Sequence, residues 1–391
     1  MSIRFVYHRI TLADSIVQGM AGAAIVDYSS GLFLTAPRRT GKSTFLREDL
    51  IPACTAQGWE TVYVDLWTNR DVSPAILIEK AIATKLIEHQ TQIQKLFTAT
   101  GANKITLLRS ISWDLTTSAL PDEATLADAL QLLYLATDRM VVLIVDEAQH
   151  ALNSDAGMNS MFALKAARDA LNQGETRPGL RLVFTGSSRD KLAQLVLNTK
   201  QPFFGAQITP FPLLGRDFVE AYTEDLNTKL AERNRFQVDA MYRAFELVGN
   251  RPELLASIVS RIALEMGEAP NLGDLLESNA HAFQQELWGE YSLSFDPLPN
   301  IQKAVLKAVA RSLASREPFA AYKEETVKLI ARLAREQNPE CDLPTAQHIQ
   351  QALEALRTKE LIWRVGRGMY ALEDEGMADW LASQAEDAPK A

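Results

Sequence analysis

The sequence has 391 residues, 47% of them hydrophobic, and a formal net charge of -9. This length allows two or three packed domains, and the acidic balance excludes a protein that coats nucleic acid or anionic membrane through its overall charge. The two cysteines, Cys54 and Cys341, are far apart and lack metal-site spacing, and the apolar runs are too short to cross a bilayer. We therefore expect a cytoplasmic protein without a membrane partner.

Short apolar runs alternate with helical patterns from about residue 30 to 212. Apolar residues recur at helical spacing over residues 78–86 and 126–133, and Thr125 with Asp128 resembles a capping box. Continuous apolar runs in βαβ order predict an α/β fold with a parallel sheet, whose ligands bind at the carboxyl ends of the strands. The predicted strands are residues 31–35 (GLFLT), 60–66 (ETVYVDL), 140–146 (MVVLIVD), 181–185 (RLVFT) and 207–211 (QITPF).

A phosphate-binding loop is predicted directly after the first strand. It meets the pattern G-x-x-x-x-G-K-[ST] except at its first position, which is alanine, and helix-compatible residues follow it. Successive backbone N–H groups would form an anion nest, Lys42 would reach the β- and γ-phosphates, and the Ser43 hydroxyl would bind Mg²⁺. The pattern predicts binding of ATP or ADP. The loop residues are Ala36, Pro37, Arg38, Arg39, Thr40, Gly41, Lys42, Ser43 and Thr44.

Two carboxylates, Asp146 and Glu147, follow the third strand. Asp146 suits a metal position, and Glu147 suits orienting or deprotonating the attacking water. The fourth strand ends in the polar residues 185–188, and we expect Ser187 to lie between the Asp146 strand and the γ-phosphate, an ordinary turn being the alternative. Hydrolysis of ATP with Mg²⁺ is therefore predicted, with Lys42, Glu147 and Ser187 as catalytic residues.

The pattern becomes helical after residue 213, and a Pro-rich segment at residues 296–300 indicates a boundary. We predict a P-loop ATPase core over residues 1–213, a helical lid over 214–295 and a winged-helix domain over 296–391. The last domain has three amphipathic helical patterns, at residues 301–313, 325–335 and 345–357. A hairpin of residues 361–365 and 369–372 follows them.

These motifs resemble the AAA-like branch of P-loop ATPases that contains the archaeal-type and STAND ATPases and, more distantly, origin-recognition ATPases. The matching phrases are APRRTGKST, VVLIVDEAQ, FTGSS and PFFGAQITPFPLL. The resemblance implies that Arg251 and Pro252, in the phrase GNRP, lie over the nucleotide, a plain helix start being the alternative. It also implies a winged helix that ends near YALED and a last helix that buries Met377, Trp380 and Leu381.

Relatives often carry an arginine before the fifth strand, where residues 204–206 read FGA. Because of this departure, no residue is assigned as an intersubunit arginine finger, and self-assembly into a ring or filament stays open. Arg189 and Arg216 are the substitutes, with a surface role as the alternative for both.

Four basic residues gather at the end of the third winged-helix helix and on the wing, where DNA-binding winged helices contact phosphates. The acidic residues 373–375 dilute this patch, and many winged helices of STAND-type relatives pack against the nucleotide domain. Contact with duplex DNA and packing on protein therefore both stay open. The candidate DNA contacts are Arg357, Lys359, Arg364 and Arg367.

The leading hypothesis is an ATP-hydrolysing switch or assembly factor that couples its nucleotide state to a DNA or protein partner. The alternative is a nucleotide-binding regulatory module with little turnover that signals through its winged helix. A small-molecule kinase is a third interpretation, which the Asp146–Glu147 pair and the winged helix disfavour. Residues 90–121, including Trp113, receive no role.

Overall fold

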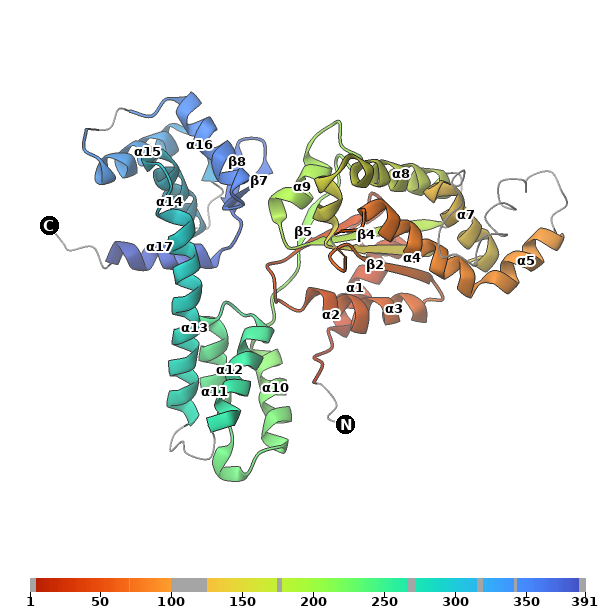
Figure 1. The fold of residues 1–391 in the computed structure, drawn as a ribbon, viewed down its shortest axis with the longest axis horizontal. Helices are drawn as coiled ribbons and strands as arrows, with labels where there is room; N and C mark the ends of the chain where they lie inside the picture. The colour runs from red at the N-terminus through yellow and green to blue at the C-terminus, as the bar shows by residue number, and fades with distance from the viewer. Residues whose placement is uncertain are drawn as a thin grey trace.

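The computed structural model describes residues 5–69, 71–99, 125–173, 178–265, 272–314, 319–340 and 343–386. Figure 1 shows an α/β unit, a group of helices below it and a second mixed unit that is reached through the long helix α13 (Leu272–Phe295). Trp113, which received no role above, lies outside the described residues. Within the described part of the chain, no helix is long and apolar enough to span a membrane.

Five parallel strands form the central sheet, in the order β2-β3-β4-β1-β5. All five predicted runs form strands, and the expected α/β fold with a parallel sheet is confirmed. Because β4 lies between β1 and β3, the loops that follow these two strands flank the end of β4 at one edge of the sheet. The strands are β1 (Leu32–Thr35), β2 (Glu60–Asp65), β3 (Val141–Asp146), β4 (Leu180–Gly186) and β5 (Ile208–Pro210).

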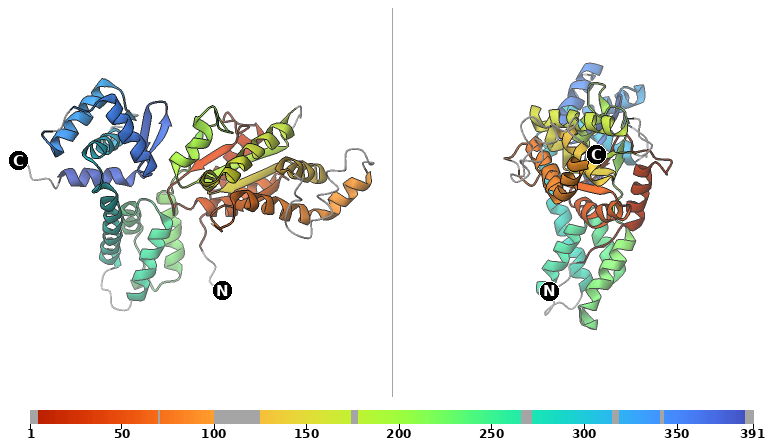
Figure 2. Two further views of the ribbon diagram at one scale, coloured as in Figure 1. Left: turned by 45° about the horizontal axis from the view of Figure 1, so that its top comes forward. Right: turned by 90° about the vertical axis from the view of Figure 1, so that its right-hand side faces the viewer.

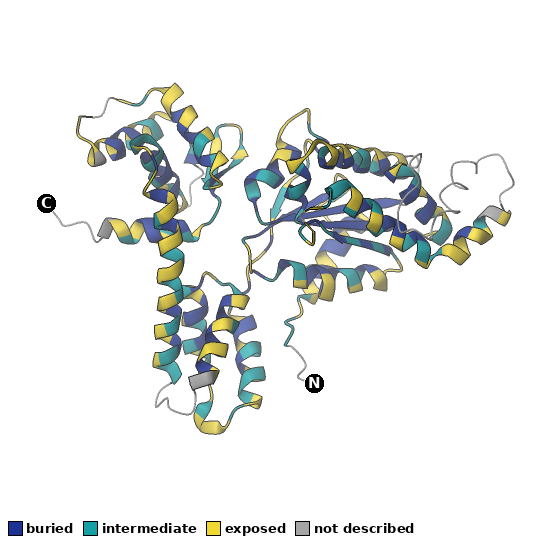
Figure 3. Cartoon of the chain, viewed as in Figure 1, coloured by how far each residue is buried: buried dark blue, intermediate teal, exposed yellow. Residues whose placement is uncertain are grey.

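Helices cover both faces of the sheet, and the strands are its most buried part (Figure 3). In β3, Val141, Leu143 and Val145 join the core on one face, whereas Val142 and Ile144 join the core on the other. This alternation is the period of two that a strand imposes, and it explains why a doubly covered strand is continuously apolar. One face carries α4 (Pro74–Glu88), α7 (Leu126–Thr137), α8 (Asp155–Asn172) and α9 (Arg189–Leu197); α5 (Gln90–Ala99) lies beside α4 and α7.

The opposite face carries α1 (Ile10–Ala21) and the helix that begins in the phosphate loop. That helix runs through α2 (Lys42–Phe45), a π-helical segment (Leu46–Leu50) and α3 (Ile51–Ala56). Pro52 stands at the start of α3 and has no N–H to donate, which accounts for the change of hydrogen-bond pattern just before it. The capping box at Thr125 and Asp128 is present at the start of α7, as predicted.

A helical unit follows β5 and has its own apolar core. Phe218 and Val219 of α10 pack there with Leu255 and Ile258 of α12, and the amino-terminal Tyr7 packs edge-on against Phe218. The beginning of α13 also joins this core. The helical unit consists of α10 (Arg216–Thr228), a short 3-10 turn (Glu232–Asn234), α11 (Val238–Leu247) and α12 (Pro252–Glu265).

The third unit combines helices with a small antiparallel sheet in the order β6-β8-β7. Its core includes Met377, Trp380 and Leu381 of the last helix, together with Tyr291 and Phe295 from the end of α13. Three helices and a hairpin of this kind make a winged helix. The elements are α14 (Asn300–Ala314), β6 (Phe319–Ala320), α15 (Glu324–Gln337), α16 (Ala346–Thr358), β7 (Ile362–Gly366), β8 (Met369–Leu372) and α17 (Gly376–Glu386).

Candidate nucleotide site

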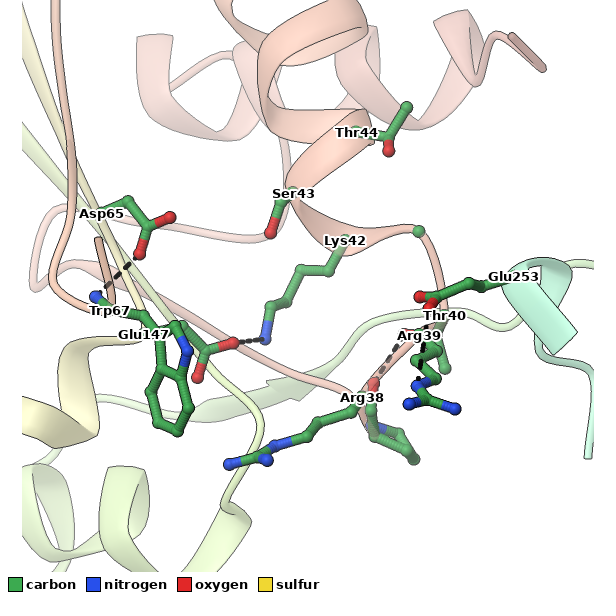
Figure 4. A pocket seen from close by; sticks show the side chains of 12 residues that line it. Arg38, Arg39, Thr40, Lys42, Ser43, Thr44, Asp65, Trp67, Glu147 and Glu253 are labelled. Carbon is green, nitrogen blue, oxygen red and sulfur yellow. Dashed lines mark hydrogen bonds and ion pairs between the residues drawn. The ribbon is translucent and has the colours of Figure 1, made fainter. Parts of the chain in front are cut away.

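The loop after β1 curls around the start of α2 and lines a cavity of about 340 Å³ (Figure 4). Gly41 has φ +86°, a conformation that glycine adopts without strain, and it lets the loop turn into the helix. Ala36 is fully buried and has no positive φ, so this position does not require a glycine here. The Thr40 hydroxyl donates to the Pro37 carbonyl at 2.8 Å and fixes the loop. All the predicted loop residues from Pro37 to Thr44 line the cavity.

Lys42 and Glu147 meet inside this cavity, although 105 residues separate them. The Lys42 Nζ atom lies 3.3 Å from Glu147 Oε1, and the Lys42 side chain is only 6% exposed. Glu147 has φ +54°, which turns its side chain from the end of β3 towards the loop. Burial alone raises the pKa of Glu147, but the Lys42 charge and hydrogen bonds from Gln149 and Ser187 outweigh it and lower the pKa. Glu147 is therefore held as a carboxylate.

Ser187 lies beside Glu147 and not beside Asp146. Its hydroxyl donates to Glu147 Oε2 at 2.9 Å. Gln149 Nε2 donates to the same carboxylate oxygen and also lies 3.2 Å from Ser187 Oγ. Gly186 makes room for this arrangement, because a Cβ atom there would collide with Gln149 Oε1. Gln149 was not predicted, since no spacing in the motif marks it.

Asp146 is fully buried at the end of β3. Its carboxylate accepts hydrogen bonds from Thr185 of β4 and, at 3.1 Å, from the Tyr63 hydroxyl of β2. Asp65, its register partner on β2, lines the cavity, and burial raises the pKa of Asp65. Tyr63 and Asp65 were also missed by the sequence reasoning, because neither belongs to a motif.

The donors at this edge of the sheet fit a magnesium ion. The Ser43 hydroxyl and the Asp65 carboxylate line the cavity, and the buried Asp146 carboxylate stands next to Asp65 in the sheet. All three are hard oxygen ligands. The described residues contain no group of three acidic, histidine or cysteine side chains able to hold a metal by themselves. This is expected for Mg²⁺, which is usually held by one or two protein oxygens, water and the phosphates of its substrate.

A second cavity of about 820 Å³ continues from the first, and Arg38 and Trp67 line both. The Arg38 guanidinium lies 4.8 Å from the centroid of the Trp67 ring, and Trp67 meets the His150 ring edge-on. Gln149 and Ser187 form part of its wall. The two residues that hydrogen-bond the Glu147 carboxylate therefore border a roomy cavity.

Arg251 and Pro252 stand at the start of α12, above the phosphate loop. Pro252 approaches Gly41 closely enough that a Cβ atom there would lie 3.9 Å from Pro252 Cγ. Glu253, also in the first turn of α12, lies 3.6 Å from Arg39. The Arg251 guanidinium, however, binds Asp374 of the winged helix at 2.7 Å. The structure therefore brings the helix start to the loop and directs the Arg251 side chain elsewhere.

The two arginines considered as finger substitutes are both engaged with carboxylates. Arg189 binds Glu375 at 2.8 Å. Arg216 binds Glu220 at 3.0 Å and Asp239 at 2.5 Å on the outside of the helical unit. Residues 204–206 form a turn between α9 and β5.

The four basic residues predicted to contact DNA divide into two pairs. Lys359 and Arg367 are exposed. Arg357 instead binds Asp190 of α9 at 2.8 Å, and the Arg364 side chain donates to the Gly366 carbonyl of its own hairpin at 3.2 Å. Part of the patch therefore faces the α/β unit.

No family model and no curated protein matches this sequence. Among solved structures, the chain is similar to a Walker-type ATPase of Pyrococcus abyssi, with 16% identity, 96% of both chains covered and a TM-score of 0.54. It is also similar to the ORC2 protein of Aeropyrum pernix in its ADP form, with 13% identity, 99% of this chain and 97% of that chain covered, and a TM-score of 0.57. At these identities the likeness shows the fold, and the predicted distant resemblance to origin-recognition P-loop ATPases is confirmed at that level.

Proposed function

We propose that this protein is a Mg²⁺-dependent ATPase that acts as a molecular switch or assembly factor. The observation that carries the proposal is the meeting of Lys42 and Glu147 in a loop-lined cavity at the carboxyl ends of β1 and β3. A lysine for the phosphates and a carboxylate for the water are the two protein groups that phosphoanhydride hydrolysis needs most. The fold shared with the ORC2 protein in its ADP form agrees with a nucleotide ligand.

Each residue of the site has a separate role in this proposal. The loop amides and Lys42 bind the phosphates, and Lys42 then exchanges its partner Glu147 for phosphate oxygens. Glu147, oriented by Ser187 and Gln149, accepts the proton of the attacking water. Ser43 and Asp146, with Asp65 nearby, would hold Mg²⁺, whose charge neutralises the phosphates. We place this activity in the cytoplasm, where ATP is available.

The partner side of the proposal rests on the winged helix. Lys359 and Arg367 are exposed cations at the end of α16 and on the wing, and Arg357 and Arg364 lie next to them in sequence. Duplex DNA is the polyanion that such a patch fits. The switch would then report ATP state through the position of the winged helix to DNA or to a protein partner.

Turnover and binding of ATP by the wild type and by Glu147→Gln, each with and without duplex DNA, test the proposal. We expect the variant to bind ATP and to hydrolyse it at least about 10²-fold more slowly. Glu48→Gln is the matched control, because Glu48 is exposed on the helix that follows the loop and lies outside the cavity. A wild type that hydrolyses no ATP under any of these conditions contradicts the ATPase proposal.

A regulatory module with little turnover is the second candidate. It is favoured by the engagement of Arg189 and Arg216 with carboxylates, which leaves the charge of the transition state to Lys42 and the metal. ATP binding that Lys42→Ala abolishes, together with no turnover in the wild type, would select this candidate. Turnover that Glu147→Gln abolishes would reject it.

A further inference from the structure

The acidic segment Glu373-Asp374-Glu375, between β8 and α17, makes a concentrated set of contacts outside the winged helix. Glu373 accepts the backbone N–H groups of Arg189 and Asp190 and so caps α9. Asp374 binds Arg251, and Glu375 binds Arg189. We call these three carboxylates the acidic latch. They join the winged helix to the α/β unit and to the start of α12 at once.

The acidic latch binds Arg251, which directly precedes the two residues of α12 that approach the phosphate loop, Pro252 and Glu253. Arg251 directly precedes Pro252, which approaches Gly41 of the phosphate loop, and its side chain is 13% exposed. It follows Asn250, whose φ of +56° sets the direction of the chain into α12. The carboxylate of Asp374 and the phosphates of a nucleotide are alternative anions for this guanidinium.

The contact between the winged helix and α9 also engages Arg357, one of the four basic residues of the winged-helix patch. Arg357 Nε and Nη2 donate to Asp190 at 2.8 and 3.1 Å, and the Arg364 backbone N–H donates to the same carboxylate at 3.2 Å. Lys191 binds Glu360 at 2.5 Å alongside. Helix α9 and strand β7 therefore lie side by side (Figure 2). Asp190, whose side chain is only 6% exposed, thus holds Arg357 in an ion pair.

We propose that the acidic latch holds a closed state in which Arg251 is withheld from nucleotide phosphates and Arg357 from nucleic-acid phosphates. ATP and DNA then bind preferentially to an open state, in which the acidic latch is released. Because each shifts the same equilibrium, ATP strengthens DNA binding and DNA strengthens ATP binding by the same factor. The nucleotide and DNA arms of this inference rest on the proposed function, whereas the latch itself does not.

Amide hydrogen exchange of the α9 start tests the latch without any ligand. Removing the latch as Glu373→Ala, Asp374→Ala and Glu375→Ala deprives the Arg189 and Asp190 amides of their acceptor, and we expect them to exchange at least tenfold faster. The charge-matched control replaces Glu324, Glu325 and Glu336, which are exposed on α15, with alanine. Equal protection of the α9 start in the wild type, the latch variant and the control overturns the proposal.

Asp374→Asn tests the nucleotide arm with a smaller change that leaves Glu373 in place. We expect this variant to bind ATP several-fold more tightly than the wild type, and ATP to accelerate exchange at Arg189 and Asp190 in the wild type. An unchanged ATP affinity in Asp374→Asn overturns the competition for Arg251. If neither protein binds ATP, the proposed function fails, and the ligand-free exchange experiment still decides whether the latch exists.

The coupling is measured as duplex DNA affinity with and without a non-hydrolysable ATP analogue. We expect the analogue to strengthen DNA binding of the wild type several-fold. The triple latch variant should bind DNA more tightly than the α15 control without the analogue and show no further gain with it. A latch variant and a control with equal DNA affinities overturn the DNA arm.

Discussion

Arg357 of the winged helix and Asp190 of α9 in the α/β unit form an ion pair of 2.8 Å, although 167 positions separate them in the chain. The Asp190 carboxylate is almost fully buried, so this pair is protected from water and salt. It is the clearest sign that the winged helix has a defined resting place on α9.

Removing the Asp190 charge should free Arg357 for DNA. We expect Asp190→Ala to bind duplex DNA about tenfold more tightly, about 1.4 kcal/mol, and to steepen the salt dependence by about one unit of log K against log salt. Fluorescence titrations over a range of salt concentrations measure both. Asp169→Ala, an exposed acidic residue of α8, is the control, and adding Arg357→Ala to the Asp190 variant should remove the gain. An unchanged affinity would show that this pair does not limit DNA contact.

The Ser187 hydroxyl should matter through Glu147. Its hydrogen bond stabilises the charged carboxylate and contributes to the lowered pKa of Glu147. We expect Ser187→Ala to lower kcat about tenfold and to move the acidic limb of the kcat profile to higher pH, because the carboxylate loses a donor. Steady-state rates from pH 5 to 9 test this, and an acidic limb at the wild-type position argues that Ser187 does not orient Glu147.

Gly186→Ala should displace Gln149 from the Glu147 carboxylate. The new Cβ atom collides with the end of a flexible side chain, so we expect a small loss of stability, about 1 kcal/mol, and a fall in kcat of about tenfold. Gly289→Ala is the matched control. It lies on the exposed side of α13 with open space around it, and should stabilise the chain by about 0.5–1 kcal/mol and leave kcat unchanged. Thermal unfolding and turnover measurements separate the two effects.

Docking of the winged helix should weaken as pH rises. Burial raises the pKa of Glu373 to about 7, although the Arg189 and Asp190 amides and the Arg189 charge act in the other direction. The other charged groups at this contact form three ion pairs, Arg357–Asp190, Lys191–Glu360 and Arg189–Glu375. Because the docked carboxyl holds its proton more tightly than the undocked one, its contribution is complete below about pH 4.5 and is lost as pH rises through about 7.

Exchange of the α9 amides between pH 5 and 8, corrected for the intrinsic rate, measures this dependence. Protection should fall across the interval in the wild type. In Glu373→Gln, which cannot ionise, protection should stay level. A parallel decline in both proteins would assign the pH dependence to another group.

The strands and the central pair of the site followed from the sequence because their causes are local. Continuous apolar runs specify strands covered on both faces, and the carboxyl ends of parallel strands lie at one edge of the sheet. The loop motif predicted Lys42, and the acidic end of the third strand predicted Glu147. Gln149 was not, because its position depends on the left-handed backbone of Glu147, which no pattern around that residue announces.

The partners of the acidic segment, residues 373–375, could not be predicted from the sequence. Residues 373–375 were interpreted as diluting the basic patch of the winged helix, because they lie close to its arginines in the sequence. In the structure, Asp374 instead meets Arg251, 123 residues away, and Glu373 meets α9. Such pairings come from the docking of whole units, which is not encoded in any local period.

The single helix α13 connects the helical unit rigidly to the winged helix. Its beginning packs in the core of the helical unit and its end in the core of the winged helix, so one rod of 24 residues belongs to both. At about 1.5 Å per residue the rod is roughly 36 Å long, and tilting one end by about 10° carries the other about 6 Å. A small tilt of the helical unit, in which α12 contacts the phosphate loop, would therefore move the winged helix by several ångströms. Such a movement exceeds the length of every ion pair described at α9.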